Sequence, residues 1–192
     1  MSPREALLIV DVQRDFCDGG ALAAPHADDI LPALNRHIAE AHARGLPIYA
    51  SRDWHPPVTS HFEAYGGEWP PHCVEGTPGA EFHPQLELPA ETIVISKGSD
   101  PSRPGYSAFD GRTDTGRSLM DDLRARRIES VAVAGLTTDY CVKETVLDAR
   151  RGGLDVTVLA DAIAGINAKP GDADRALAEM TAAGARIARG RA

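Results

Sequence analysis

The sequence contains no long hydrophobic run. None of its 192 residues lies in an apolar segment approaching the roughly 20 residues that a membrane-spanning helix requires. The first residues, MSPREALLIVDVQ, also lack the basic region and the cleavage site of a secretory signal peptide. We therefore expect a cytoplasmic protein that does not enter a membrane.

Cysteine and clustered positive charge are scarce as well. Three cysteines without a Cys-x-x-Cys pair do not make a disulfide framework, so we expect reduced thiols. The chain has 20 Lys and Arg against 28 Asp and Glu, a formal net charge of −8, and its basic residues are dispersed. Nucleic acids and anionic membranes select clustered positive charge, so a small molecule is the expected partner instead. The oligomeric state is left open, and a homo-oligomer is compatible with the sequence.

Internal repeats and low-complexity tracts are absent, and the length suits a single domain over residues 1–192. Short apolar runs alternate with segments of helical periodicity. The expected strands are 6–10, 48–50, 92–96, 131–134 and 156–159, with a short edge strand at 185–188, and the expected helices are 29–44, 116–127, 138–151 and 173–184. This alternation predicts an α/β protein whose mainly parallel sheet is covered by helices on both faces.

One long segment, at about 52–91, breaks this pattern. It is dense in Pro, Gly, His and Trp and shows no periodicity. Loops of this length in a compact domain are usually functional or disordered. The aromatic residues argue against disorder because they need something to pack on, so we expect an ordered, functional loop.

Three ionisable side chains stand near the ends of predicted strands. Asp11 follows the first strand, Lys97 follows the third, and Cys141 lies in the first turn of the helix after strand 131–134, with Thr138 as the expected N-cap. Ligands of parallel sheets bind outside these carboxyl ends. A thiol with a pKa of about 8.5 needs a proton acceptor or a positive neighbour to become a nucleophile, and Asp11 and Lys97 offer both. Alternatively, Cys141 is an unreactive buried thiol.

A second group of polar residues lies in the long loop. Asp53 and His55 are two residues apart on an extended segment and therefore point the same way, and His61 and His72 follow. Carboxylate and imidazole ligands suit one divalent ion, Zn²⁺, Fe²⁺ or Mn²⁺. The alternative is that these histidines stack among the tryptophans of the loop.

Three aromatic residues, Phe16, Trp69 and Tyr106, lie on loops that follow three different strands. They are candidates to line a flat slot for a planar ring. The alternative is that they belong to the hydrophobic core.

Several motifs together resemble one enzyme family. They are DVQRDFCDGGAL, SRDWHPP, WPPHCVEGTPGAEFHP, the KG pair at Lys97, GYSAFDG and GLTTDYCV. In this order and over nearly the whole chain, they are similar to nicotinamidases of the isochorismatase-like cysteine hydrolase superfamily. The resemblance implies a three-layer α/β/α sandwich with a six-stranded, mainly parallel sheet. It also implies metal-dependent hydrolysis of nicotinamide to nicotinate and ammonia through a cysteine thioester, a step of NAD salvage, with pyrazinamide as a side substrate.

The resemblance also implies a role for each residue that matches a family motif. Cys141 corresponds to the nucleophile, Asp11 to the general acid and base, and Lys97 to the activating cation. The implied metal ligands are Asp53, His55 and His72, with His61 as a fourth ligand found in some members. The implied oxyanion hole is formed by the N–H groups of Thr137 and Cys141 beside a cis peptide bond between Leu136 and Thr137, and the implied ring contacts are Phe16, Trp69 and Tyr106.

Two residues depart from the family pattern, and two other functions remain open. Arg14 stands where Asn is frequent and Tyr140 where His is frequent, so both are candidates to change the substrate range. One alternative is a related cysteine hydrolase that acts on another small amide or an N-carbamoyl compound. The other is a metal-binding or ligand-binding module without turnover.

Overall fold

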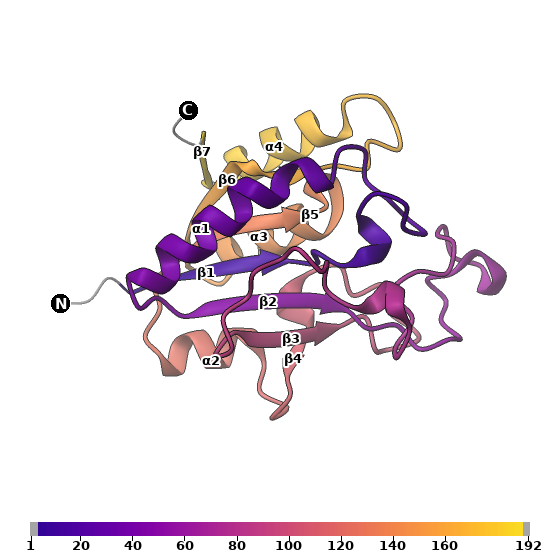
Figure 1. The fold of residues 1–192 in the computed structure, drawn as a ribbon, viewed down its shortest axis with the longest axis horizontal. Helices are drawn as coiled ribbons and strands as arrows, with labels where there is room; N and C mark the ends of the chain where they lie inside the picture. The colour runs from indigo at the N-terminus through magenta and orange to yellow at the C-terminus, as the bar shows by residue number, and fades with distance from the viewer. Residues whose placement is uncertain (1–3, 190–192) are drawn as a thin grey trace.

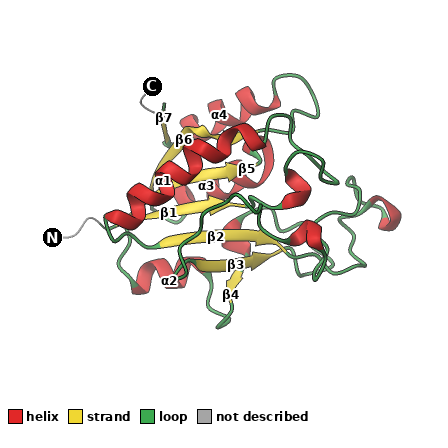
Figure 2. Ribbon diagram, viewed as in Figure 1, coloured by secondary structure: helices red, strands yellow, loops and turns green. Residues whose placement is uncertain are grey.

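The computed structural model describes residues 4–189, which form one seven-stranded sheet with helices on both faces (Figures 1 and 2). The strands are β1 (Glu5–Val10), β2 (Ile48–Asp53), β3 (Ile93–Lys97), β4 (Arg112–Thr113), β5 (Ser130–Leu136), β6 (Asp155–Ala164) and β7 (Arg186–Ala188), and their order in the sheet is β4-β3-β2-β1-β5-β6-β7. Every neighbouring pair is parallel except β3 and β4. The fold class is therefore as predicted.

The sheet has one strand more than the six that we predicted. The additional strand, β4, pairs antiparallel with Ile95 and Ser96 at the edge of the sheet. Two residues are too few to leave an alternating or apolar pattern in a sequence, so this segment looked like part of a loop. β6 is also longer than the predicted 156–159, because its continuation pairs with Gly135 and Leu136 after a register shift.

The two faces of the sheet bury different helices. The helices are α1 (Leu31–Ala43), α2 (Leu119–Ala125), α3 (Lys143–Arg151) and α4 (Asp172–Ala182). Alternate residues of β1 separate the two cores: Leu7 and Ile9 share a cluster with Leu34 and Ile38 of α1, whereas Leu8 belongs to the cluster of α2, α3 and α4. A strand whose successive side chains are all buried has to be covered on both faces, which explains the three layers.

Two predicted helices begin later than expected. Helix α2 starts after Ser118, whose hydroxyl accepts the N–H of Asp121 at 3.1 Å. Helix α3 is preceded by a π-helical turn over Thr138–Val142, and Thr138 lies inside this turn instead of capping it. The prediction of Thr138 as the N-cap was wrong, because apolar spacing does not distinguish a π-helical turn from the first turn of an α-helix.

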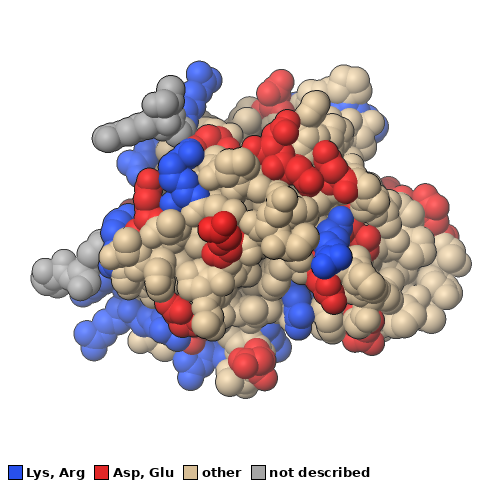
Figure 3. All heavy atoms as spheres, viewed as in Figure 1, with Lys and Arg blue, Asp and Glu red and all other residues tan. Residues whose placement is uncertain are grey.

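The loops that follow the parallel strands gather beyond one end of the sheet (Figure 1). The long loop between β2 and β3 is ordered by short 3₁₀ turns at Glu63–Tyr65 and Pro78–Ala80 and by isolated bridges, such as His55 with Val74. Within residues 4–189, no helix is long and apolar enough to cross a membrane. On the face shown in Figure 3, basic and acidic side chains are interspersed.

Candidate active site

The site begins where the chain leaves β1 and β5, two parallel neighbours at the centre of the sheet. After β1 the chain continues to β2 on one side, and after β5 it continues to β6 on the other, which makes this gap a topological switch point. Gly135 of β5 lies opposite Val10, with φ +113°, and a Cβ on it would stand 2.1 Å from the Val10 carbonyl oxygen. Only glycine permits this approach, which brings the turn carrying Cys141 beside Asp11.

Lys97 connects the predicted catalytic residues. Its Nζ lies 2.7 Å from Oδ2 of Asp11, 2.5 Å from Oδ1 of Asp53 and 3.4 Å from Sγ of Cys141. It also donates to the carbonyl oxygen of Gly105 at 3.2 Å. Lys97 is 1% exposed and Asp11 is fully buried. The structure therefore brings together three strand ends, as the sequence predicted. The buried ammonium group of Lys97 lies between their side chains.

The surroundings push the pKa values of the two carboxyl groups apart. Burial raises the pKa of Asp11, although Lys97 opposes this shift, whereas Lys97 and His55 outweigh burial at Asp53 and lower its pKa. Asp11 and Asp53 in turn outweigh burial at Lys97 and keep its pKa high. Such a division makes Asp11 the candidate for a group that exchanges a proton, whereas Asp53 favours its ionised form.

The surroundings of Cys141 favour its neutral thiol over the thiolate. Burial raises its pKa, and Lys97 offsets this rise only in part. A nucleophile in this state loses its proton as it attacks, and the acceptor has to lie close by. Asp11 meets this requirement, because one of its carboxylate oxygens lies within 4.8 Å of the sulfur. Its Oδ1 accepts the Ser51 hydroxyl at 2.7 Å, and its Oδ2 contacts Lys97.

The turn before Cys141 has the backbone that the resemblance implied. The peptide bond between Leu136 and Thr137 is cis. Within the described part of the chain, the Thr137 N–H makes no hydrogen bond to a loop carbonyl or to a side chain. Thr137 lines the same cavity as Cys141, so its N–H is a candidate donor to an oxyanion there.

Three of the four predicted metal ligands form a cluster beside Lys97. The imidazoles of His55, His61 and His72 offer nitrogen atoms within 4.8 Å of one another, and all three residues are buried. Oδ2 of Asp53 lies 3.5 Å from Nε2 of His55, while its Oδ1 contacts Lys97. Asp53 thus connects the histidine cluster to the group around Cys141, which the sequence did not predict.

The histidine cluster fits a divalent metal ion. Nδ1 of His55 donates to the Gly98 carbonyl at 2.9 Å and Nδ1 of His72 to the Pro70 carbonyl at 2.8 Å, so each Nε2 has a free lone pair. Nε2 of His55 is buried without any hydrogen-bond partner. Burial lowers the pKa of His72, and that of His61 to about 4, which keeps both imidazoles neutral, as metal binding requires.

A second group of potential ligands, Cys17, Asp28 and His83, lacks these features. Nδ1 of His83 accepts the N–H of Gln85 at 3.2 Å, so its Nε2 carries a hydrogen and faces Asp28. Burial, together with Asp28 and Asp18, raises the pKa of Cys17 to about 12. Both ring nitrogens of His83 therefore face protein groups, unlike Nε2 of His55, so the histidines beside Lys97 are the better candidate for a metal site.

A small cavity of about 10 Å³ lies between Cys141 and the histidine cluster. It is lined by Phe16, Leu22, Asp53, His61, Trp69, His72, Tyr106, Thr137, Tyr140, Cys141 and Ile166. The indole N–H of Trp69 donates to the Tyr106 hydroxyl at 2.9 Å, and Tyr140 packs edge-on against Trp69 with the ring centroids 5.0 Å apart. The structure therefore brings the three predicted ring contacts into one pocket and adds Tyr140 to them.

Sequence reasoning missed four other residues of the site. Ser51 binds Asp11, and Leu22 and Ile166 line the cavity. The fourth, Gln13, donates to the Asp53 carbonyl at 2.8 Å and accepts the Asp53 N–H at 2.7 Å, which fixes the backbone of that residue. Gln13 and Leu22 lie in the motif DVQRDFCDGGAL and Ser51 begins the motif SRDWHPP, whereas Ile166 lies in a segment without any motif.

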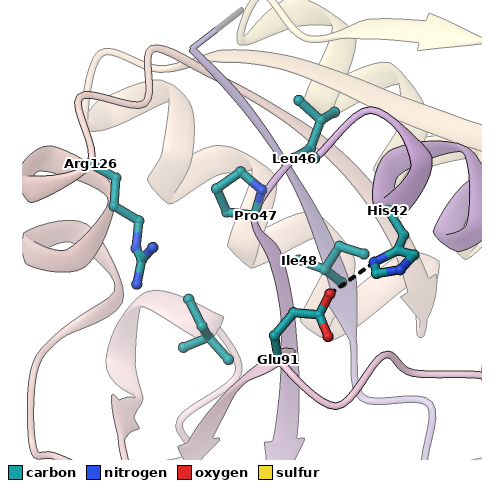
Figure 4. Close-up of a pocket in the computed structure, with 8 residues that line it drawn as sticks. His42, Leu46, Pro47, Ile48, Glu91 and Arg126 are labelled. Carbon is teal, nitrogen blue, oxygen red and sulfur yellow. Dashed lines mark ion pairs between the residues drawn. The ribbon is translucent and has the colours of Figure 1, made fainter. Parts of the chain in front are cut away.

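A larger surface cavity has different chemistry (Figure 4). It measures about 580 Å³ and lies at the amino end of β2, beside Ile48. His42 and Glu91 form an ion pair of 2.9 Å there, with Arg126 on the opposite side. Its lining contains no thiol and no group of three potential metal ligands. The smaller cavity beside Cys141 is therefore the candidate active site.

Known proteins share this fold and sequence. The chain is 43% identical to a nicotinamidase of Escherichia coli, across 96% of this chain and 94% of that one, and 43% identical to a nicotinamidase/pyrazinamidase of Mycobacterium tuberculosis, across 85% and 88%. The crystal structure of a Pyrococcus horikoshii pyrazinamidase in complex with zinc superimposes with a TM-score of 0.90 at 45% identity, across 98% of this chain and all of that one. The model of the isochorismatase domain matches residues 5–191. The protein therefore belongs to the isochorismatase family of hydrolases.

Proposed function

We propose that this protein is a nicotinamidase, which hydrolyses nicotinamide to nicotinate and ammonia in NAD salvage. The observation that carries the proposal is the contact of Lys97 with Asp11, Asp53 and Cys141, next to three histidines with free imidazole nitrogens. The relatives named nicotinamidase and pyrazinamidase support the amide substrate, with pyrazinamide as a second one. The aromatic side chains that line the cavity suit a small planar substrate.

The first half of the reaction forms a thioester. Asp11 accepts the proton of the Cys141 thiol while the sulfur attacks the carboxamide carbon. The oxyanion accepts hydrogen bonds from the N–H groups of Thr137 and Cys141. Protonated Asp11 then donates its proton to the amide nitrogen, the C–N bond breaks and ammonia leaves. Lys97 stays charged in this scheme, because Asp53 remains ionised beside it even while Asp11 carries a proton.

The second half consumes one water molecule. Asp11 accepts one proton from the water while the water oxygen attacks the thioester carbon, and the C–S bond breaks to release nicotinic acid, which ionises to nicotinate by giving its proton to the solvent or to ammonia. The sulfur recovers a proton from Asp11, which restores the resting state. The aromatic walls Phe16, Trp69 and Tyr106 orient the ring during both halves.

The residues that would hold the divalent ion are His55, His61, His72 and Asp53. When bound, this ion supplies an electrophilic site that orients the pyridine nitrogen of the substrate. The chain itself fixes the imidazoles through the Gly98 and Pro70 carbonyls, so the ligand geometry is built before any ion arrives.

The test is ammonia and nicotinate release from nicotinamide by the purified protein, with and without added Zn²⁺, Fe²⁺ or Mn²⁺. An N-carbamoyl amine serves as the competing substrate class. In an acid-quenched reaction, mass spectrometry should find a nicotinoyl group on the peptide that contains Cys141. Cys141→Ala should abolish both the adduct and turnover, whereas Cys17→Ser, which alters a buried thiol outside the site, should retain them. Turnover by Cys141→Ala would refute the mechanism.

A further inference from the structure

A buried carboxylate near the nucleophile takes no part in the reaction described above. Asp139 lies two residues before Cys141 in the π-helical turn and is 5% exposed. Its Oδ1 accepts the N–H of Ile166 at 3.0 Å, and its Oδ2 accepts the N–H of Asn167 at 2.6 Å. Asp139 therefore joins the turn that carries the nucleophile to the segment between β6 and α4.

This carboxylate has no cationic partner among residues 4–189. The Nζ of Lys143, the closest cation in the sequence, lies 3.5 Å from carboxylates of Glu144 and Glu179 instead. A buried anion is costly unless hydrogen bonds compensate its charge, and the two peptide N–H groups do so here. Asn167 is exposed, so without the carboxylate its N–H would bond to water and the segment would lose its attachment.

The segment is shaped to fit closely on Asp139. A Cβ on Gly165 would lie 3.2 Å from Oδ1 of Asp139 and 2.9 Å from the Cβ of Ala173. Asn167 has a left-handed backbone, with φ +52°, and its Oδ1 accepts the N–H of Ala173 at 3.0 Å. Helix α4 and Asp139 thus hold residues 165–167 from two sides. We call the hydrogen bonds from Ile166 and Asn167 to Asp139 the tie, because they connect this segment to the turn that carries Cys141.

The tie has a direct consequence for the substrate pocket. Ile166, whose N–H binds Asp139, lines the cavity together with Thr137 and Cys141. The cavity measures about 10 Å³, the space of about one water molecule, so its lining side chains stand close together and the position of each limits the room left for a ring. We propose that Asp139 is a positioning residue that holds Ile166 as a wall of the ring pocket, an inference that rests on the proposed nicotinamidase activity.

The first test compares Asp139→Ala with the wild type. Loss of the tie lets Ile166 retreat, so the KM for nicotinamide should rise about tenfold while kcat changes less than about threefold. The rate of Cys141 alkylation by iodoacetamide should not fall, because this small reagent does not need the Ile166 wall. Asp139→Asn should recover part of the KM effect, since its single amide oxygen can accept one of the two N–H groups.

A double-mutant cycle separates positioning from general loosening. Ile166→Ala removes the wall itself, so adding Asp139→Ala to it should raise the KM little further. Asp172→Ala is the matched control, because its carboxylate accepts the N–H of Lys169 at 2.7 Å in the same segment but accepts no N–H from a residue that lines the pocket, and its KM should equal that of the wild type. Circular dichroism confirms that each variant is folded.

Three results would overturn the inference. The first is an unchanged KM in Asp139→Ala. The second is a double variant whose rise in KM equals the product of the rises in the two single variants. The third is a parallel fall in kcat and in the rate of Cys141 alkylation, which would mean that Asp139 acts on the turn of Cys141 and not on Ile166. Failure of the proposed function is distinguishable from all three, because it would appear in the wild type as an absence of ammonia release.

Discussion

Replacing Lys97 with methionine would test the electrostatic design of the site most directly. Methionine keeps most of the side-chain volume but removes the charge that Asp11 and Asp53 share. Both carboxylates are buried, at 0% and 3% exposure, and their contacts to Nζ measure 2.7 and 2.5 Å. The variant therefore leaves two like charges together in a medium that solvates neither.

The expected loss of stability is large. Breaking a buried ion pair by removing one partner costs about 3–5 kcal/mol, because an uncompensated charge remains. For a chain of this length each kcal/mol lowers the melting temperature by about 2–4 °C, so Lys97→Met should melt about 6–20 °C below the wild type. Urea unfolding in the presence of a chelator measures the difference without a contribution from bound metal.

Two further variants show whether charge is the cause. Lys97→Met/Asp11→Asn removes one of the two stranded anions and should regain part of the lost stability, although both variants should be inactive. Lys143→Met removes a partly exposed lysine whose carboxylate contacts measure 3.5 Å, and it should cost at most about 1 kcal/mol. A Lys97→Met protein as stable as the wild type, or a double variant less stable than Lys97→Met, would refute the reasoning.

Three other perturbations have defined outcomes. His55→Gln should lower the zinc content below one ion per chain, and zinc should restore activity to a chelated wild type but not to this variant; full zinc content measured by atomic absorption would contradict the assigned ligand set. Tyr49→Phe removes the buried hydroxyl that donates to Asp122 at 2.7 Å and should lower the free energy of unfolding by about 1.5–3 kcal/mol in urea titrations. The folded state lowers the pKa of Asp122. The ionised Asp122 carboxylate therefore makes its full contribution to the free energy of unfolding when the pH is above the pKa of Asp122 in the unfolded chain, and this contribution should be lost as the pH falls through the pKa in the folded state. Gly135→Ala should cost at least about 3 kcal/mol, seen as a lower urea midpoint, since its Cβ would meet the Val10 carbonyl.

The sequence predicted residue types better than their exact surroundings. Asp11, Lys97 and Cys141 follow core strands, and parallel strands carry whatever follows them to one edge, so their meeting could be expected from the order of elements alone. Asp53 was predicted only as a metal ligand. Its second contact, with Lys97, arises because Asp53 pairs with Lys97 in the register of β2 and β3, and register cannot be read from a strand pattern.

Other parts of the site left no pattern in the sequence. The π-helical turn, the strand β4 and the tie between Asp139 and Ile166 depend on backbone geometry and on contacts across 27 residues of chain. The residues of such contacts have no fixed spacing, and a carboxylate that binds peptide N–H groups looks like any other Asp in a sequence.

By itself, the sequence determined the alternation of strands and helices, and with it the edge of the sheet where the chemistry lies. It also determined which functional groups lie near that edge, since Cys141, Lys97, Asp11 and three histidines are at or after the ends of strands in the sequence. The tertiary structure alone decided protonation and shape. Burial raises the pKa of Cys141, burial and the shared Lys97 shift the pKa values of Asp11 and Asp53 in opposite directions, and a long-range hydrogen bond from Ile166 to Asp139 ties a wall of the pocket to the turn of Cys141. These properties depend on desolvation and distance, which exist only once the chain is folded.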